Sequence, residues 1–357
     1  MEILLEYSNQ IQLLKYILYI IVLLFVIVQT TKKEAITSIF SCIIISLVFC
    51  YFVSTPIVDF SNWGDDHSVY AAQFYYSNSI NFYENSEFLF GILCYIIRCF
   101  SNDYVVFFFV ISILYCLCHI LASKNYSKNN GTLVLFIMFI SSLFFVSYGV
   151  NTIRSGLAMS LLILAFSFYK RNNFLYVLLA ICAINIHVSV ALTLVSFIVA
   201  IIIKKPKMCF TIWLISIILS VLMGSYFEEI FANMIEDDRT NTYLLVDADQ
   251  TIYNVGFRWD FVIYSMIPII VGYYFIYKKK FTDNIYNILY CTYLLANTFW
   301  ILVIRANFTD RFAYLSWALM PIILIYPLIN GNLYKHQNYA ISLVVFLNVA
   351  FTFILSL

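Results

Sequence analysis

Residues 151–192 read NTIRSGLAMSLLILAFSFYKRNNFLYVLLAICAINIHVSVAL, and this stretch decides the fold. A long apolar run follows Arg154, the short polar turn KRNN (170–173) interrupts it, and a second apolar run follows the turn. Apolar runs of this kind are typical of helices that cross a lipid bilayer. Because the turn is tight, the stretch predicts an antiparallel hairpin of two neighbouring membrane helices.

The rest of the chain has the same character. Hydrophobic residues make up 63% of the 357 residues and charged residues only 11%, and the mean hydropathy is +0.90. A soluble fold of this length would need a charged surface that so few charges cannot supply. A net charge of +1 gives no electrostatic reason to bind nucleic acid. The sequence therefore predicts an all-α polytopic membrane protein, in which residues 1–357 form a single integral membrane domain.

About twelve transmembrane helices are expected from the alternation of apolar runs and polar breaks. Their expected positions are 13–30, 36–54, 104–122, 132–149, 155–169, 174–187, 188–203, 208–224, 259–277, 285–304, 312–329 and 339–357. The segment 88–100 (FLFGILCYIIRCF) is apolar but short, and it contains Arg98. We expect it to form an interfacial or re-entrant helix within the loop 55–103 and not a span.

The lysines predict the orientation of these spans. With the twelve spans above, all the lysine-bearing breaks fall on one side of the membrane, which the positive-inside rule assigns to the cytoplasm. Six of the seven arginines, and every acidic residue except Glu34 and Asp283, then lie outside or at the outer membrane edge. Both termini are expected to be extracytoplasmic.

Two long extracytoplasmic loops, 55–103 and 225–258, are expected. In the first, acidic residues stand among aromatic ones, which is the composition of a sugar-binding surface, because rings stack on pyranose faces and carboxylates accept hydroxyl protons. The candidate residues of this loop are Trp63, Asp65, Asp66 and Tyr70. The second loop is strongly acidic and ends at Arg258. The competing interpretation is that these loops are merely solvated.

The external arginines are candidates for binding an anion, since the guanidinium fork suits phosphate and carboxylate oxygens. Asn151 and Arg154 are expected to open a helix at the outer membrane edge, where the helix N-terminus is itself electropositive. The run RANFTDRFAY (305–314) puts Arg305 and Arg311 at another external helix start. The alternative is that these arginines pair with the acidic residues around them.

His187 is the candidate general base. It ends the second helix of the hairpin, at a membrane depth similar to that of Arg154. An ionisable residue inside the membrane indicates function, and histidine exchanges a proton near neutral pH, as catalysis on a sugar hydroxyl requires. A packing role remains the alternative, in which case Asp65 or Asp66 would be the base.

The order of these motifs resembles the EpsG family over roughly residues 55–330. The matching motifs are GDD (64–66) followed by Tyr70, EFLF (87–90), N-x-I-R-x-x-L-A (151–158), K-x-x-x-F (170–174), A-x-x-x-H-x-S (183–189) and R-F-x-Y (311–314). The resemblance implies functional roles for Asp65, Glu87, Arg154, His187 and Arg311.

EpsG proteins are exopolysaccharide proteins similar to Wzy-type O-antigen and capsule polymerases. The resemblance therefore implies a membrane glycosyltransferase with a helical bundle similar to the GT-C type. Its substrates would be oligosaccharide repeat units on undecaprenyl diphosphate, joined at the outer face of the bacterial inner membrane. A chain-length regulator protein is a conceivable partner.

The arginines provide fixed positive charge where a diphosphate leaves. The sequence also has no clustered carboxylate motif of the kind that binds magnesium. For both reasons, no metal or cofactor is expected.

Two other classes of function remain open. A lipid-linked oligosaccharide flippase suits twelve spans, but the polar residues collect at one face and not at the midplane. A membrane sugar acyltransferase could use His187 as base, but it does not explain the external arginines.

Reporter fusions test the predicted topology. Fusions after Lys128 and after Lys207 should both report the cytoplasm, because they follow the third and the seventh expected span. If the fusion after Lys128 reports the outside, the segment 88–100 is a span and the map is wrong from residue 88 onward.

Overall fold

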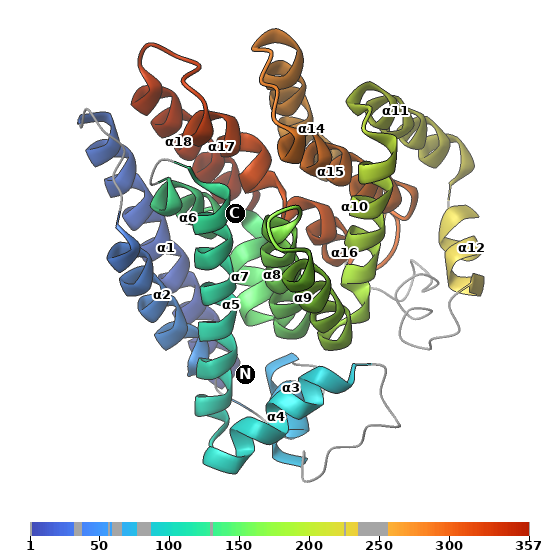
Figure 1. Cartoon of the computed structure of the whole chain (residues 1–357). Coiled ribbons are helices and arrows are strands. Elements are labelled where there is room, and N and C mark those ends of the chain that lie inside the picture. Colours follow the sequence, from blue (N-terminus) through green and yellow to red (C-terminus); the bar gives the residue numbers. More distant parts are fainter. Residues whose placement is uncertain are drawn as a thin grey trace. The chain divides into compact units, whose positions relative to one another are not determined.

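The computed structural model describes residues 2–31, 38–55, 58, 66–76, 87–128, 131–224, 226–234 and 256–356, and all regular structure within them is helical (Figure 1). In this part of the chain, seven helices are long and apolar enough to cross a membrane, or eight if one bent pair is a single span. Five shorter apolar helices accompany them. The all-α membrane architecture is thereby confirmed, whereas the number of twelve spans is not.

The chain forms two compact units, and each is described by itself. The first unit comprises Met1–Ala191 and Leu328–Leu357. Its described helices are α1 (Glu2–Thr31), α2 (Ile39–Ser54), α3 (Asp66–Tyr76), α4 (Phe88–Phe100), α5 (Tyr104–Tyr126), α6 (Thr132–Ile140), α7 (Leu143–Val150), α8 (Ile153–Phe168), α9 (Asn173–Ile186), the 3-10 helix η1 (Val188–Val190) and α18 (Gln337–Ser356). The predicted single domain stays a prediction.

The second unit comprises Leu192–Pro327. Its described helices are α10 (Ala191–Ile203), α11 (Pro206–Met223), α12 (Tyr226–Met234), α14 (Trp259–Tyr273), the π-helix η3 (Tyr274–Lys278), α15 (Asn284–Leu302), α16 (Thr309–Trp317) and α17 (Met320–Asn330), of which α10 and α17 begin or end in the first unit.

The hairpin predicted from residues 151–192 is present in the first unit as α8 and α9, which pack against each other. In the turn between them, Asn172 caps α9 by accepting a hydrogen bond from the Leu175 N–H at 3.1 Å. Such a cap satisfies one of the free amides at a helix start. The break expected at His187 is confirmed, because α9 ends there and η1 separates it from α10.

The segment 132–149, expected as one span, is broken. It forms α6 and α7, which are bent by 72° at Ser141 and Ser142. Serine hydroxyls bend helices by bonding to carbonyls one turn earlier, and the Ser142 Oγ donates to the Met138 carbonyl at 2.7 Å. Asn348 of α18 donates to the Ser141 Oγ at 2.8 Å, which supplies a polar partner where lipid and apolar side chains offer none.

In the second unit, a buried polar network joins α11, α14, α15 and α16 around Asn297. The Asn297 side chain accepts from Trp213 Nε1 at 2.8 Å and donates to Ser265 Oγ at 3.2 Å and to Ser316 Oγ at 2.9 Å. Trp317 Nε1 also donates to the Ser265 Oγ, at 2.7 Å. Each polar group in this network has a partner, so the network can specify one packing of the four helices.

Helices α7 and α8 approach each other closely at Gly156. A Cβ atom at this position would lie 2.5 Å from the Tyr148 carbonyl oxygen and 2.9 Å from its carbon. Backbone atoms cannot move aside as the end of a flexible side chain can, so only glycine fits. The contact fixes the start of α8, which carries Arg154.

We expect Gly156→Ala to destabilise the protein by about 1–3 kcal/mol, because the added methyl group forces α7 and α8 apart. The matched control is Gly91→Ala in α4, where a Cβ would meet nothing within 4 Å. That change should be neutral or stabilising by about 0.5–1 kcal/mol, since alanine loses less entropy in a helix. Thermal unfolding of the purified variants in detergent measures both, and equal melting temperatures would contradict the predicted clash.

Candidate active site

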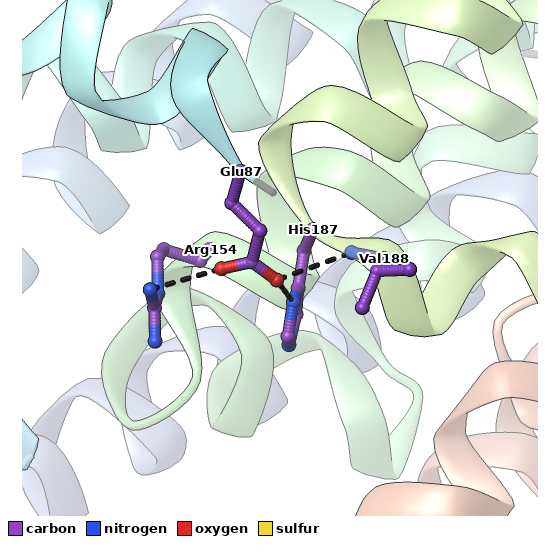
Figure 2. A network of polar contacts seen from close by, with 4 residues as sticks. All are labelled: Glu87, Arg154, His187 and Val188. Atoms are coloured by element: carbon purple, nitrogen blue, oxygen red, sulfur yellow. Dashed lines mark hydrogen bonds and ion pairs between the residues drawn. The ribbon is translucent and has the colours of Figure 1, made fainter. Parts of the chain in front are cut away.

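The structure brings three predicted site residues, Glu87, Arg154 and His187, into one network (Figure 2). Arg154 donates from Nη1 to the Glu87 Oε2 at 3.0 Å. The other carboxylate oxygen, Oε1, is hydrogen-bonded to His187 Nδ1 and accepts from the Val188 backbone N–H at 3.1 Å. Both carboxylate oxygens are therefore used, and we call these four residues the Glu87 centre.

Three helices of the first unit position the Glu87 centre. Glu87 directly precedes α4, Arg154 is the second residue of α8, and His187 lies between α9 and η1. The His187 backbone is extended (φ −156°, ψ 122°), so α9 ends there and the Val188 N–H at the start of η1 has no helical partner. Glu87 supplies that partner, and the break between the two helices thereby becomes a binding point for a carboxylate.

Aromatic side chains enclose the arginine. The Arg154 guanidinium carbon lies 5.4 Å from the ring centroid of Tyr70 in α3 and 5.8 Å from that of Phe90 in α4. Both distances are within the range of cation–π attraction. The exposed fraction of the side chain is 13% for Glu87, 18% for Arg154 and 25% for His187. The centre is thus mostly screened from solvent, with the histidine its most accessible member.

The surroundings of Glu87 keep it ionised. Burial by itself raises the pKa of Glu87, but the hydrogen bond and electrostatic attraction of His187, the charge of Arg154 and the Val188 N–H together hold that pKa below its ordinary value. An ionised carboxylate can only accept hydrogen bonds, so His187 must donate from Nδ1. Nε2 is then the ring nitrogen that can take a proton from a substrate. A carboxylate fixes the catalytic histidine in the same way in serine proteases.

Some buried polar atoms belong to residues of the Glu87 centre or to their neighbours along the chain. In the described parts of the chain, Thr152 Oγ1, Arg154 Nε and Ser189 Oγ are buried without a hydrogen-bond partner. Buried polar atoms are usually paired in folded proteins. Thr152 directly precedes α8 and Ser189 lies in η1, so these atoms lie next to members of the Glu87 centre along the chain.

Asn151 is placed differently from the prediction. It follows the last residue of α7, and its N–H donates to the Ser147 carbonyl at 2.8 Å. Helix α8, which carries Arg154, begins only at Ile153. The expectation that Asn151 and Arg154 open the same helix is therefore wrong, because the chain changes helix between them.

The candidates from the first long loop divide into two groups. Asp66 is the first residue of α3, and Tyr70 lies in the same helix with its ring against Arg154. Trp63 and Asp65 lie outside the described residues. Tyr70 is therefore the member of this set that the structure joins to the Glu87 centre.

Three predicted arginines belong to the second unit. Arg258 pairs with Asp260 through two hydrogen bonds of 3.0 and 2.6 Å, as the alternative interpretation of the arginines expects. Arg305 donates to the carbonyl oxygens of Ser220 and Gly224. Arg311 lies over the Phe308 ring, with 4.6 Å between its guanidinium carbon and the ring centroid.

The described residues contain no group of three or more His, Cys, Asp or Glu side chains that could hold a metal ion. The function without metal or cofactor, which the sequence suggests, stays a prediction.

These features define a polytopic, all-helical membrane protein with a partly buried carboxylate that joins a histidine to an arginine. The EpsG family matches residues 43–357, which is most of the chain, and the protein belongs to this family. EpsG is a family of Wzy-like polymerases, so membership suggests a membrane protein similar to polysaccharide polymerases. Searches of curated proteins and of solved structures give no match.

Sequence reasoning missed the Val188 N–H as part of the Glu87 centre and the Phe90 ring as a neighbour of Arg154. The Val188 amide becomes available only through the extended conformation of His187, which residue types do not indicate. Phe90 lies in the first turn of α4, three residues after Glu87, and residues at this spacing are neighbours at a helix start. Once Glu87 was a candidate site residue, this spacing could have predicted that Phe90 lies near it.

The lowered pKa of Glu87 predicts a pH dependence of stability. A carboxyl with a lowered pKa in the folded state stabilises the fold above its ordinary pKa, and this contribution is lost as the pH falls through the lowered value. We therefore expect the wild type to be more stable than Glu87→Gln at neutral pH, and the difference to shrink in the acidic range. Thermal unfolding of both proteins as a function of pH measures it, and a difference that stays constant down to pH 3 would contradict the prediction.

Proposed function

We propose that this protein is a Wzy-type polysaccharide polymerase, which joins oligosaccharide repeat units carried on undecaprenyl diphosphate. The observation that supports it most is the Glu87 centre in a member of the EpsG family: a carboxylate holds His187 and Arg154 of the hairpin together. A polymerase needs a base for the acceptor hydroxyl and positive charge near the leaving diphosphate, and these residues are suited to both tasks.

In the proposed reaction, His187 Nε2 takes the proton of a hydroxyl group at the non-reducing end of the incoming repeat unit. The hydroxyl oxygen then forms a bond with the anomeric carbon of the growing chain. The bond between that carbon and undecaprenyl diphosphate breaks, and the diphosphate leaves with the electron pair. Glu87 accepts from His187 Nδ1 throughout and stabilises the positive charge that the ring gains.

Arg154 is proposed to bind the diphosphate while it remains paired with Glu87. One of its nitrogens is occupied by the Glu87 Oε2, but the buried Nε has no partner in the described structure. A guanidinium group can serve a carboxylate on one side and a phosphate on another, because its five N–H groups point in fixed, different directions. The role that the resemblance implies for Arg311, at the start of α16, stays a prediction.

The proposed setting is the bacterial inner membrane, with twelve spans, both termini extracytoplasmic and the Glu87 centre on the outer side. The helices α2, α8, α9 and α10, which are shorter than a typical span, coincide with four of the expected spans. The amphipathic helix α4 buries Phe90, Cys94 and Ile97 on one face, which suits a helix that lies at the membrane surface.

The surface polysaccharide of complemented deletion strains tests the proposed function. His187→Gln cannot take a proton and Glu87→Gln cannot hold the ring as an ion, so each should lower polymerisation about 100-fold or more. Both strains should accumulate single repeat units on the lipid acceptor. Arg154→Lys should be nearly as defective as Arg154→Ala, since lysine keeps the charge but loses the fork.

The matched control is His336→Gln, which changes an exposed histidine far along the chain from the Glu87 centre and should leave long polymer unchanged. Long polymer in the His187→Gln strain, at normal protein level, would assign His187 to packing. A deletion strain without even single repeat units would indicate a flippase, and normal polymer that lacks acyl groups would indicate an acyltransferase.

A further inference from the structure

A second polar cluster lies in the second unit, where the segment 303–308 joins α15 to α16. The Arg305 N–H donates to the Glu228 Oε1 at 3.1 Å, and the Arg305 Nη1 donates to the carbonyl oxygens of Ser220 at 2.8 Å and Gly224 at 3.0 Å. Arg305 therefore ties this segment to the end of α11 and to α12. Its guanidinium satisfies backbone carbonyls that a helix end leaves open.

Two buried oxygen atoms of this cluster lack partners. Glu228 is 2% exposed and Asn307 is 7% exposed, yet in the described part of the protein neither the Glu228 Oε2 nor the Asn307 Oδ1 has a hydrogen-bond partner. A buried polar atom left unpaired costs about 1–3 kcal/mol. Two such atoms, on residues linked through Arg305, are unusual for a cluster whose only role is structural.

The chemistry of Glu228 suits a neutral partner. Burial raises the pKa of Glu228, and hydrogen bonds to its carboxylate and the charge of Arg305 oppose this only in part. Its neighbour Glu229 adds a negative charge, which also disfavours an anion. A hydroxyl group carries no charge and can donate a hydrogen bond to Oε2.

The segment is also strained next to Asn307. Phe308 has a left-handed backbone (φ 51°, ψ 38°), which is uncommon for any residue except glycine, asparagine and aspartate. Strain of this kind persists where the surrounding structure enforces it, and such residues gather at ligand sites. The conformation of Phe308 is therefore an observation independent of the unpaired oxygens.

Aromatic rings pack against the same segment. Val303 and Ala306 are buried and pack against the partly buried rings of Phe231, Phe299 and Phe312. Phe231 follows Glu228 by three residues on α12, so the two share one face of that helix. Phe231 and Phe299 are in ring contact, with their centroids 4.8 Å apart. Ring faces and hydrogen-bonding oxygens together match the apolar face and the hydroxyl rim of a sugar.

We propose that Glu228 and Asn307, with the rings of Phe231, Phe299 and Phe312, form a binding site for an uncharged sugar residue. The Glu228 Oε2 and the Asn307 Oδ1 pair with its hydroxyl groups, and the rings contact its apolar face. The residues of this site all belong to the second unit. It rests on the proposed function only for the choice of saccharide, which is a sugar of the repeat unit.

Equilibrium binding of an oligosaccharide to the purified protein in nanodiscs tests this site. The probe is one repeat unit, released by mild acid from the polysaccharide of the producing bacterium and radiolabelled. Glu228→Gln keeps an oxygen for the Arg305 N–H but can place an NH2 group where Oε2 was, and Asn307→Leu removes the unpaired oxygen. Each should weaken binding at this site at least about tenfold. Neither should lower the melting temperature, because neither the Glu228 Oε2 nor the Asn307 Oδ1 has a hydrogen-bond partner in the described part of the protein.

The matched control is Glu229→Gln, which changes an exposed acid on the same helix and should bind the probe as the wild type does. Wild-type affinity in both Glu228→Gln and Asn307→Leu, or no binding by the wild type, would overturn the proposal. Glu87→Gln separates the two proposals. It should lose polymerisation but keep the affinity of this site, whereas full polymerisation by Glu87→Gln would contradict the function proposed for the Glu87 centre and leave the sugar site standing.

Discussion

A carboxylate that stays ionised away from water must receive hydrogen bonds, and in this protein that requirement is met at Glu87. Its donors come from three places in the chain: the start of α8, the end of α9 and the first amide of η1. Each of these must be held in position, because a buried charge that loses a donor is costly. The tight contact of α7 with Gly156, the cap on α9 and the break at His187 all contribute to that positioning.

The sequence predicted the hairpin, and it predicted a similar membrane depth for Arg154 and His187, because apolar runs and a polar turn are local signals. Periodicity could not predict that Glu87 contacts both Arg154 and His187, since Glu87 is 67 residues from Arg154 and 100 residues from His187. Its functional role was implied by the family resemblance. The bend between α6 and α7 was not predicted either. Its polar partner Asn348, which donates to the Ser141 Oγ, is more than 200 residues away in the sequence.

The arginines outside the expected cytoplasmic side had two competing interpretations, anion binding and pairing with acids, and the contacts within the protein bear on the second. Arg258 pairs with a neighbouring acid, as a solvated surface residue would. Arg154 also pairs with an acid, but that acid simultaneously holds a histidine, so the ion pair organises a site and does more than neutralise a charge. Arg305 has a third role that residue type could not predict: it binds backbone carbonyls, and in the described part of the chain oxygens of Glu228 and Asn307 close to it stay unpaired.

The central claim is that Glu87 and His187 act as one catalytic unit, and a double-mutant cycle on the polymerisation rate tests it most directly. The rate would be measured with purified protein in nanodiscs and lipid-linked repeat units, for the wild type, Glu87→Gln, His187→Gln and the double variant. If Glu87 acts by holding His187, the double variant should be hardly slower than His187→Gln alone, because residues of one unit are strongly non-additive. Rate losses that multiply in the double variant would show that the two residues act independently and would contradict the account.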